Sequence, residues 1–444
     1  MSDGSATGER WRHRLARRAR RAEAATPLVV EGRLRRVVGL TLEAEGCEAP
    51  LGARCLVAAA GGAQLDTEVV GFADDRLLLM PVTEMHGVLP NARVRPCSHT
   101  GGLPVGAALL GRVIGADGVP LDGAGPLDVD EHASLKREPI NPMARKPIDA
   151  PLDTGVRAIN ALLTVGRGQR LGLFAGSGVG KSTLLGMMTR YTDADVVVVG
   201  LIGERGREVK EFVEHTLGEE GRARAVIVAA PADAPPLKRL RGAQYATAIA
   251  EWFREQGGNV LFLLDSVTRL ARAQREVGLA AGEPAARQGY PPSVFSMLPR
   301  LLERTGNSAR GHCTALYTCL VAGDDLDDPV ADEVRSILDG HVVLDRRIAE
   351  RGRWPAVDVL ASLSRVMPQV TTREHRRLAA RFRELLAAYE QRRDLILLGA
   401  YAPGSDPLTD EAIARQPALE GFLAQGREEP AGALLERMRK AVEE

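Results

Sequence analysis

The stretch Ala-Gly-Ser-Gly-Val-Gly-Lys-Ser at residues 175–182 decides the fold of this chain. The apolar run at residues 170–174 precedes it and predicts a buried strand, while residues 183–188 follow it with the pattern of the first turns of a helix. A strand, a glycine-rich loop and a helix with Lys-Ser at the hinge form a phosphate-binding P-loop. The usual pattern begins with glycine, whereas this loop begins with Ala175.

The glycines of this loop allow backbone N–H groups to converge on a phosphate chain, and the helix N-terminus adds partial positive charge there. We expect Lys181 to reach the β- and γ-phosphates of a nucleotide and the hydroxyl of Ser182 to bind Mg²⁺. The loop thus predicts a bound nucleotide and Mg²⁺ as cofactors. The predicted nucleotide-binding residues of the loop are Gly176, Ser177, Gly178, Val179, Gly180, Lys181, Ser182 and Thr183.

The length, net charge and cysteine content of the chain limit the classes of protein to which it can belong. A chain of 444 residues is long enough for two or three domains. Its formal net charge is zero, so the whole molecule has no strong bias toward nucleic acid, and no apolar run approaches the ~20 residues needed to cross a bilayer. The five cysteines are scattered without metal-ligand spacing, and no apolar stretch follows the first charges, so we expect a cytoplasmic protein with reduced thiols and no secretory signal.

Residues 1–27 form a basic N-terminal segment, with seven arginines between residues 10 and 21. If helical, most of these arginines share one face, and Trp11, Leu15 and Ala22 form a narrow apolar stripe. This pattern favours a helix that docks on a partner protein or an anionic membrane surface. A disordered, solvated tail is the alternative.

Residues 28–100 contain short β-rich runs separated by turn signals, a spacing typical of a small closed β-barrel. Barrels that bind single-stranded nucleic acid need aromatic stacking platforms, and Phe72 is the only aromatic residue in this range. We therefore interpret the barrel as an assembly element rather than a nucleic-acid interface.

Residues 101–372 are predicted to form the nucleotide domain with its leading connector. Residues 101–150 are rich in Gly and Pro, as in a connection of turns. From Leu152, apolar strands alternate with helices, which predicts a mostly parallel sheet covered on both faces. The predicted later strands occupy residues 196–202, 225–229 and 260–264, and a helix is predicted at residues 237–255.

Two acidic residues follow the ends of these strands, where ligands bind in open α/β sheets. Asp265 fits an acid that holds Mg²⁺ through water, with an exposed helix-capping turn as the alternative. Glu204 fits a general base that orients the attacking water, with a salt bridge to Arg205 or Arg207 as the alternative. We also assign Arg205, beside Glu204, to the nucleotide-binding set.

Several motifs carry a family resemblance. Residues 176–182, 203–209 and 264–269 resemble the catalytic α/β-subunit family of the rotary ATPases. Within that family, the segments at 282–284, 289–295, 323–325 and 337–341 are similar to the type III protein-export ATPases. The segments at 39–44, 87–94 and 399–401 resemble the flagellar branch of these ATPases.

The resemblance implies a RecA-like core between the barrel and a helical C-terminal domain, assembled as a homohexamer. It also implies that Arg365 is catalytic, because the matching arginine reaches the γ-phosphate in the neighbouring subunit's site. Trp354 stands where relatives often carry Tyr, and an aromatic side chain there could stack on adenine, with a buried packing role as the alternative. Tyr401 is a second candidate for contact with adenine.

Residues 373–444 are predicted to be helical, with a core stripe of Leu378, Phe382, Leu385, Leu386 and Tyr389. The resemblance implies partners for this machine: a regulator protein at the N-terminal segment, a central stalk protein, export chaperone–substrate complexes and an export gate at the inner face of the cytoplasmic membrane. It implies no nucleic acid.

The leading functional hypothesis is an ATP hydrolase of the flagellar type III protein-export apparatus. The injectisome ATPase has the same chemistry in a different host machine, and the catalytic subunit of a rotary proton-translocating ATP synthase is a more distant alternative. A hexameric RNA translocase and a non-catalytic nucleotide-binding subunit also stay open, and the role of Glu204 separates the second of these from an enzyme.

Overall fold

The computed structural model describes residues 11, 15, 29–97, 102–321, 323, 327–427, 429, 430 and 432–443. The chain divides into two compact units, one formed by Met1–Met80 with Met85–His99 and the other by Pro81–Glu84 with Thr100–Glu444. Trp11 and Leu15 are exposed helical residues, and the rest of the basic segment 1–27 lies outside the described residues.

The first unit contains a closed barrel with the strand order β1-β2-β5-β4-β3-β6, which confirms the predicted barrel. Its core is apolar because side chains alternate between the two faces of each strand, and Leu42, Cys55 and Leu79 are fully buried. The turn between β1 and β2 contains Gly39 at φ +56°, a conformation that glycine adopts without strain. The strands are β1 (Gly32–Val38), β2 (Thr41–Glu45), β3 (Arg54–Ala58), β4 (Gln64–Ala73), β5 (Arg76–Pro81) and β6 (Arg93–Pro96).

The second unit is built on an eight-stranded sheet with the order β18-β17-β12-β16-β15-β13-β14-β8. Every neighbouring pair is parallel except β17 and β18, so the sheet is mostly parallel as predicted. The strands are β8 (Val113–Gly115), β12 (Arg170–Ala175), β13 (Val196–Ile202), β14 (Ala225–Ala230), β15 (Asn259–Asp265), β16 (His312–Leu320), β17 (Gly340–Leu344) and β18 (Val357–Ser364).

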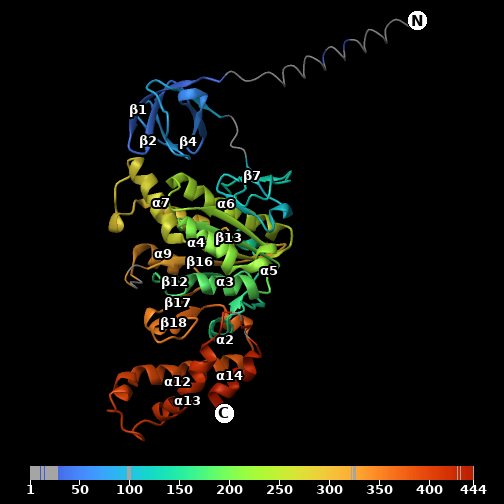
Figure 1. The fold of residues 1–444 in the computed structure, drawn as a ribbon, viewed down its shortest axis with the longest axis vertical. Helices are drawn as coiled ribbons and strands as arrows, with labels where there is room; N and C mark the ends of the chain where they lie inside the picture. The colour runs from blue at the N-terminus through green and yellow to red at the C-terminus, as the bar shows by residue number, and fades with distance from the viewer. Residues whose placement is uncertain are drawn as a thin grey trace, which may run out of the picture. The chain divides into compact units, whose positions relative to one another are not determined.

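Both faces of this sheet are covered by helices (Figure 1). Helices α6 (Pro236–Glu255) and α7 (Val267–Ala280) pack on one face, and α3 (Lys181–Tyr191) packs on the other. The central strands β13 and β15 are therefore buried along their whole length, which explains their continuous apolar sequences.

The connector holds more structure than its sequence indicates. Residues 113–115 form β8, which pairs in parallel with β14 and closes one edge of the sheet. The same region also contains β7 (Leu103–Pro104) and β9 (His132–Ala133), which pair with each other in a small antiparallel sheet. The strand was missed because three apolar residues between turn signals are too short to show a period.

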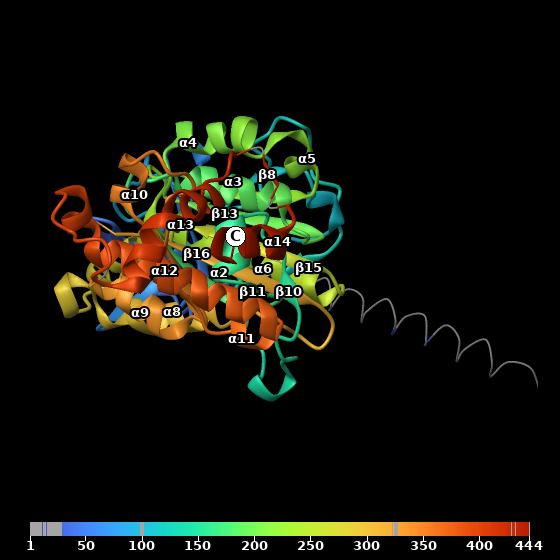
Figure 2. The same cartoon turned by 90° about the horizontal axis from the view of Figure 1, so that it is seen from below.

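The C-terminal region is helical, as predicted, and consists of α12 (Arg373–Leu397), α13 (Pro407–Leu423) and α14 (Leu434–Glu443). These helices pack over α2 (Arg157–Leu162), as Figure 2 shows. The predicted stripe on α12 forms the core of this region: four of its residues are buried and Tyr389 is partly buried. Among the described residues, no helix has the length and apolar character needed to span a membrane.

Candidate active site

The P-loop connects the end of β12 to the start of α3. The loop covers residues 176–180, and α3 begins at Lys181. Gly178 and Gly180 adopt φ values of +77° and +87°, which glycine tolerates without strain. A side chain at Gly180 would also collide with the ring of Trp354, since a Cβ there would lie 2.6 Å from a ring carbon. Both constraints explain the glycine.

Two carboxylates meet the P-loop lysine at the carboxyl ends of neighbouring strands. Glu204 follows β13, Asp265 ends β15, and the two strands pair directly. The Nζ atom of Lys181 lies 2.5 Å from Oδ1 of Asp265 and 3.3 Å from Oε1 of Glu204. Glu204 is 6% exposed and Asp265 4%, so the cluster is buried.

This geometry excludes the structural alternative named for each acid. Asp265 is not an exposed turn residue, and the side chain that caps α7 is that of Ser266. Glu204 forms its ion pairs with Lys181 and, at 3.6 Å, with Arg269. The adjacent arginines pair elsewhere: Arg205 with Glu208 at 3.5 Å and Arg207 with Glu211 at 2.6 Å.

The electrostatics keep Lys181 charged. Burial of the ammonium group acts to lower the pKa of Lys181, but the carboxylates of Asp265 and Glu204 together act more strongly, and the pKa lies above its ordinary value. Thr318, on β16, donates a hydrogen bond of 2.7 Å to Oδ1 of Asp265 and fixes the orientation of that carboxylate.

These groups line a crevice of about 520 Å³, a volume within the range of small-molecule sites. The crevice brings together most of the predicted site, namely Gly176, Ser177, Gly178, Gly180, Lys181, Ser182, Thr183, Glu204, Arg205 and Asp265. Val179 does not line it, because its side chain is buried beneath the loop.

Sequence reasoning missed two arginines of the crevice. Arg269 and Arg272 lie on α7 and line the cavity beside Asp265. Their spacing of four and seven residues from Asp265 places them on the same face of a helix that begins at this strand end, and that spacing is the signal that would have identified them.

The donor set fits Mg²⁺ held chiefly by a nucleotide and water. Within the described part of the chain, no group of three or more His, Cys, Asp or Glu side chains could hold a metal ion. Ser182 is exposed on the crevice wall and Asp265 supplies a buried carboxylate, so the available donors are oxygen atoms. Mg²⁺ prefers oxygen ligands and keeps several waters when it binds with substrate phosphates.

The remaining predicted residues lie in three different environments. Trp354 packs on Gly180 of the P-loop and stays partly exposed. Tyr401 follows α12, and its hydroxyl donates to the carboxylate of Asp410 at 3.0 Å; it does not line the crevice. Arg365 follows β18, is exposed, and does not line the crevice of its own chain.

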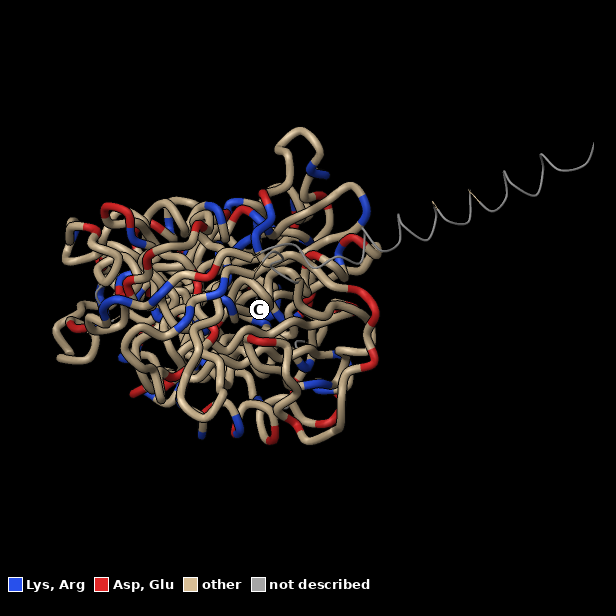
Figure 3. The backbone as a smooth tube through the Cα atoms, turned by 90° about the horizontal axis from the view of Figure 1, so that it is seen from above, with Lys and Arg blue, Asp and Glu red and all other residues tan. Residues whose placement is uncertain are grey.

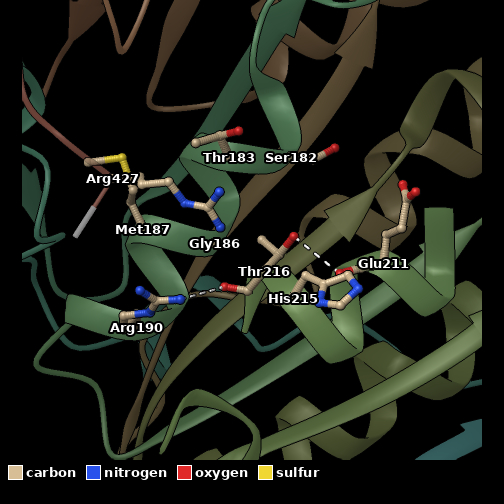
Figure 4. A pocket seen from close by; sticks show the side chains of 9 residues that line it. All are labelled: Ser182, Thr183, Gly186, Met187, Arg190, Glu211, His215, Thr216 and Arg427. Carbon is tan, nitrogen blue, oxygen red and sulfur yellow. Dashed lines mark hydrogen bonds between the residues drawn. The ribbon is translucent and has the colours of Figure 1, made fainter. Parts of the chain in front are cut away.

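A smaller cavity of about 240 Å³ adjoins the crevice and shares Ser182, Thr183 and Glu211 with it. Figure 4 shows Arg427 reaching over α3 toward Gly186, with Glu211 and His215 on the opposite side.

Along the chain, basic and acidic residues are interspersed, as Figure 3 shows.

Two protein-family descriptions match this chain. Residues 155–364 match the nucleotide-binding domain of the ATP synthase alpha/beta family. Residues 371–439 match the T3SS EscN ATPase C-terminal domain.

Similar sequences span nearly the whole chain. The Flagellum-specific ATP synthase of Pseudomonas aeruginosa is 57% identical over 93% of this chain and 93% of its own length. The Flagellum-specific ATP synthase of Salmonella typhimurium is 56% identical over 89% of each chain. The Type 3 secretion system ATPase of Xanthomonas euvesicatoria is 49% identical over 89% of each chain.

Solved structures are similar at the level of the whole fold. The assembled ATPase EscN of the enteropathogenic E. coli type III secretion system matches with a TM-score of 0.88 and 44% identity, covering 93% of this chain and all of EscN. The same ATPase in complex with its central stalk EscO matches with a TM-score of 0.85 and 43% identity, with the same coverage.

Proposed function

The chain belongs to the ATP synthase alpha/beta family, and from this membership we propose that it is the ATPase of a flagellar type III protein-export apparatus. The observation that supports hydrolysis is the meeting of Lys181, Glu204 and Asp265 in one buried crevice beside a P-loop. A non-catalytic nucleotide-binding subunit would not need a second acid aimed at the same lysine.

The crevice residues divide the work of phosphoryl transfer to water. The loop amides and Lys181 bind the β- and γ-phosphates, while Glu204 orients the attacking water and accepts its proton. A bound triphosphate would compete with Asp265 for the ammonium group of Lys181. The carboxylate of Asp265 would then be available to hold Mg²⁺ through water. Mg²⁺ bound at Ser182 would neutralise charge on the β- and γ-phosphates.

The adenine ring of the nucleotide and the charge that develops on the transferred phosphoryl group need further contacts. Trp354 lies on the P-loop with its ring partly exposed and offers a stacking surface for adenine. Arg205 lines the crevice and adds a cation near the phosphates. Arg365 stabilises the transferred phosphoryl group of a neighbouring protomer, which requires assembly into a closed ring, here a homohexamer.

The flagellar assignment over the injectisome alternative is supported by two flagellar relatives at 57% and 56% identity, against 49% for the Type 3 secretion system ATPase of Xanthomonas euvesicatoria. The fold likeness to EscN bound to its central stalk supports a stalk protein as a partner of the ring. Peripheral association with the inner face of the cytoplasmic membrane, through residues 1–27, completes the proposal, together with a regulator protein, chaperone–substrate complexes and the export gate as partners.

The test of hydrolysis is Glu204→Gln in the full-length protein. We expect kcat to fall about 10²–10⁴-fold, because the general base is lost, while ATP binding is retained. Glu251→Gln is the matched control, since Glu251 is also a buried carboxylate, held by Arg304 at 2.8 Å on both oxygens and outside the crevice. Unchanged turnover in the Glu204→Gln variant would contradict the assignment of Glu204 as the general base.

A further inference from the structure

Asp339 links the start of the P-loop strand to Arg365, the residue that follows β18. Its carboxylate accepts hydrogen bonds from the backbone N–H of Arg170 at 3.1 Å, from Nε of Arg170 at 3.1 Å and from Nη2 at 3.3 Å. Arg170 is the first residue of β12, whose other end continues into the P-loop. Asp339 belongs to the motif at residues 337–341, to which the proposed mechanism gives no role.

The backbone of Asp339 also holds the backbone of Arg365 in place. The carbonyl oxygen of Asp339 accepts from the backbone N–H of Arg365 at 3.0 Å and from Nε2 of Gln169 at 3.0 Å. The same Nε2 donates to Oγ of Ser364 at 3.0 Å, and that hydroxyl donates to the carbonyl of Thr164 at 2.9 Å. The last residue of β18 is thus fixed from two sides.

The residue after Asp339 must be glycine for this contact to form. Gly340 pairs with Ser364 across β17 and β18 and has φ +154°. A Cβ at Gly340 would lie 2.4 Å from the carbonyl oxygen of Leu363, so a side chain would push the two strands apart. The close approach keeps Arg365 next to Asp339.

We propose that Asp339 is a positioning residue for Arg365: its bonds to Arg170 fix its backbone, and that backbone fixes the point from which the Arg365 side chain projects toward the neighbouring protomer's site. The inference rests on the proposed role of Arg365 in the neighbouring site. A misplacement of about 1 Å at a reacting group costs up to about 10²-fold in rate. Asp339→Asn keeps the size of the side chain but loses the charge-assisted pairing with Arg170. We expect kcat to fall roughly 10- to 100-fold, with KM for ATP unchanged.

A rival explanation is that Asp339 supports the P-loop of its own chain through Arg170 and β12. Mixed rings separate the two. A Glu204→Gln protomer keeps Arg365 but is inactive at its own P-loop, whereas an Asp339→Asn protomer keeps its P-loop and Glu204. If Asp339 acts through Arg365, one kind of mixed site is intact. It combines the P-loop of an Asp339→Asn protomer with the Arg365 of a neighbouring Glu204→Gln protomer.

The experiment mixes Glu204→Gln with Asp339→Asn at equal concentrations and measures ATP hydrolysis. We expect activity well above either variant alone, because about a quarter of the sites in a randomly mixed ring pair the two intact halves. Arg365→Ala mixed with Glu204→Gln is the reference pair. If that pair does not recover activity, the proposed role of Arg365 fails, and the inference about Asp339 fails with it.

Two results overturn the inference about Asp339 alone. One is recovery in the Arg365 pair without recovery in the Asp339 pair, when Asp339→Asn assembles and binds ATP. The other is an unchanged kcat for Asp339→Asn. The double variant Asp339→Asn/Arg365→Ala is expected to be no slower than Arg365→Ala, because both substitutions remove the same contact.

Asp122→Asn is the matched control, since Asp122 accepts from Nε of Arg112 at 2.8 Å and from Nη2 at 3.0 Å near β8, at the opposite edge of the sheet. It should lower stability without changing turnover. Should Asp339→Asn fail to fold, Ser364→Ala replaces it in the mixture, because it loosens the end of β18 through the bonds to Thr164 and Gln169. The same recovery is expected, and its absence in an assembled variant overturns the proposal.

Discussion

Lys181→Ala should destabilise the protein even when no nucleotide is present. The ammonium group of Lys181 lies 2.5 Å from Asp265 and 3.3 Å from Glu204, and its side chain is only 11% exposed. Removing it leaves two buried carboxylates without their shared cation. Removing one partner of a buried ion pair typically costs about 3–5 kcal/mol.

The lower end of that range applies here. Thr318 continues to donate to Asp265, and Arg269 lies 3.6 Å from Glu204, so neither carboxylate loses every partner. We therefore expect a loss of about 3 kcal/mol. For a unit of roughly 350 residues, with an unfolding entropy of about 2.1 cal/mol/K per residue, this corresponds to a fall of about 4 °C in the melting temperature.

The assay is thermal unfolding of the nucleotide-free protein, followed by calorimetry. Lys210→Ala is the control: Lys210 pairs with Glu214 at 3.8 Å on an exposed helix, where such a pair contributes about 0.3–0.5 kcal/mol. Adding Asp265→Asn to Lys181→Ala should recover part of the loss, because it removes one of the two unpaired charges. Equal melting temperatures for Lys181→Ala and the wild-type chain would refute the reasoning.

Three further predictions concern Arg365, Trp354 and the charge of Lys181. Arg365→Ala should lower kcat about 10³–10⁵-fold while sparing ATP binding and assembly; normal specific activity in the assembled variant would contradict the role in trans. Trp354→Ala should raise KM for ATP severalfold and Trp354→Tyr should not, because an aromatic ring packed on Gly180 would stack on adenine. Equal KM values for the two variants, measured in steady-state hydrolysis, would exclude stacking. The pKa of Lys181 is raised, so its contribution to stability is complete below its ordinary pKa of 10.5 and is lost as the pH rises through the higher folded-state value. The melting-temperature gap between wild type and Lys181→Ala should therefore stay constant through neutral pH and narrow only in strongly alkaline solution, and a gap that narrows near neutral pH would argue against a charged lysine.

The sequence predicts those parts of the site that local patterns encode. Glu204 and Asp265 could be found because each follows an apolar run that is long enough to be a buried strand, and neighbouring parallel strands end at one edge of a sheet. Thr318 could not be found, because it lies within β16 and meets Asp265 only when distant strands become neighbours. The contact of Trp354 with Gly180 is likewise invisible in the sequence, since it joins two segments that are 174 residues apart.

The charge of the crevice supports the proposal that a neighbouring chain completes the site. Five basic and four acidic side chains line the crevice, and Lys181 is shared between two of the acids, so the crevice has little positive charge left for a polyanionic triphosphate. The developing charge on the transferred phosphoryl group needs more positive charge than the crevice side chains supply together. In the proposed mechanism, Mg²⁺ would provide part of that charge. Arg365 is exposed and lies away from its own crevice, so we propose that it provides the rest in the site of another protomer. On this proposal, nucleotide binding is a property of the single chain, whereas fast hydrolysis is a property of the ring.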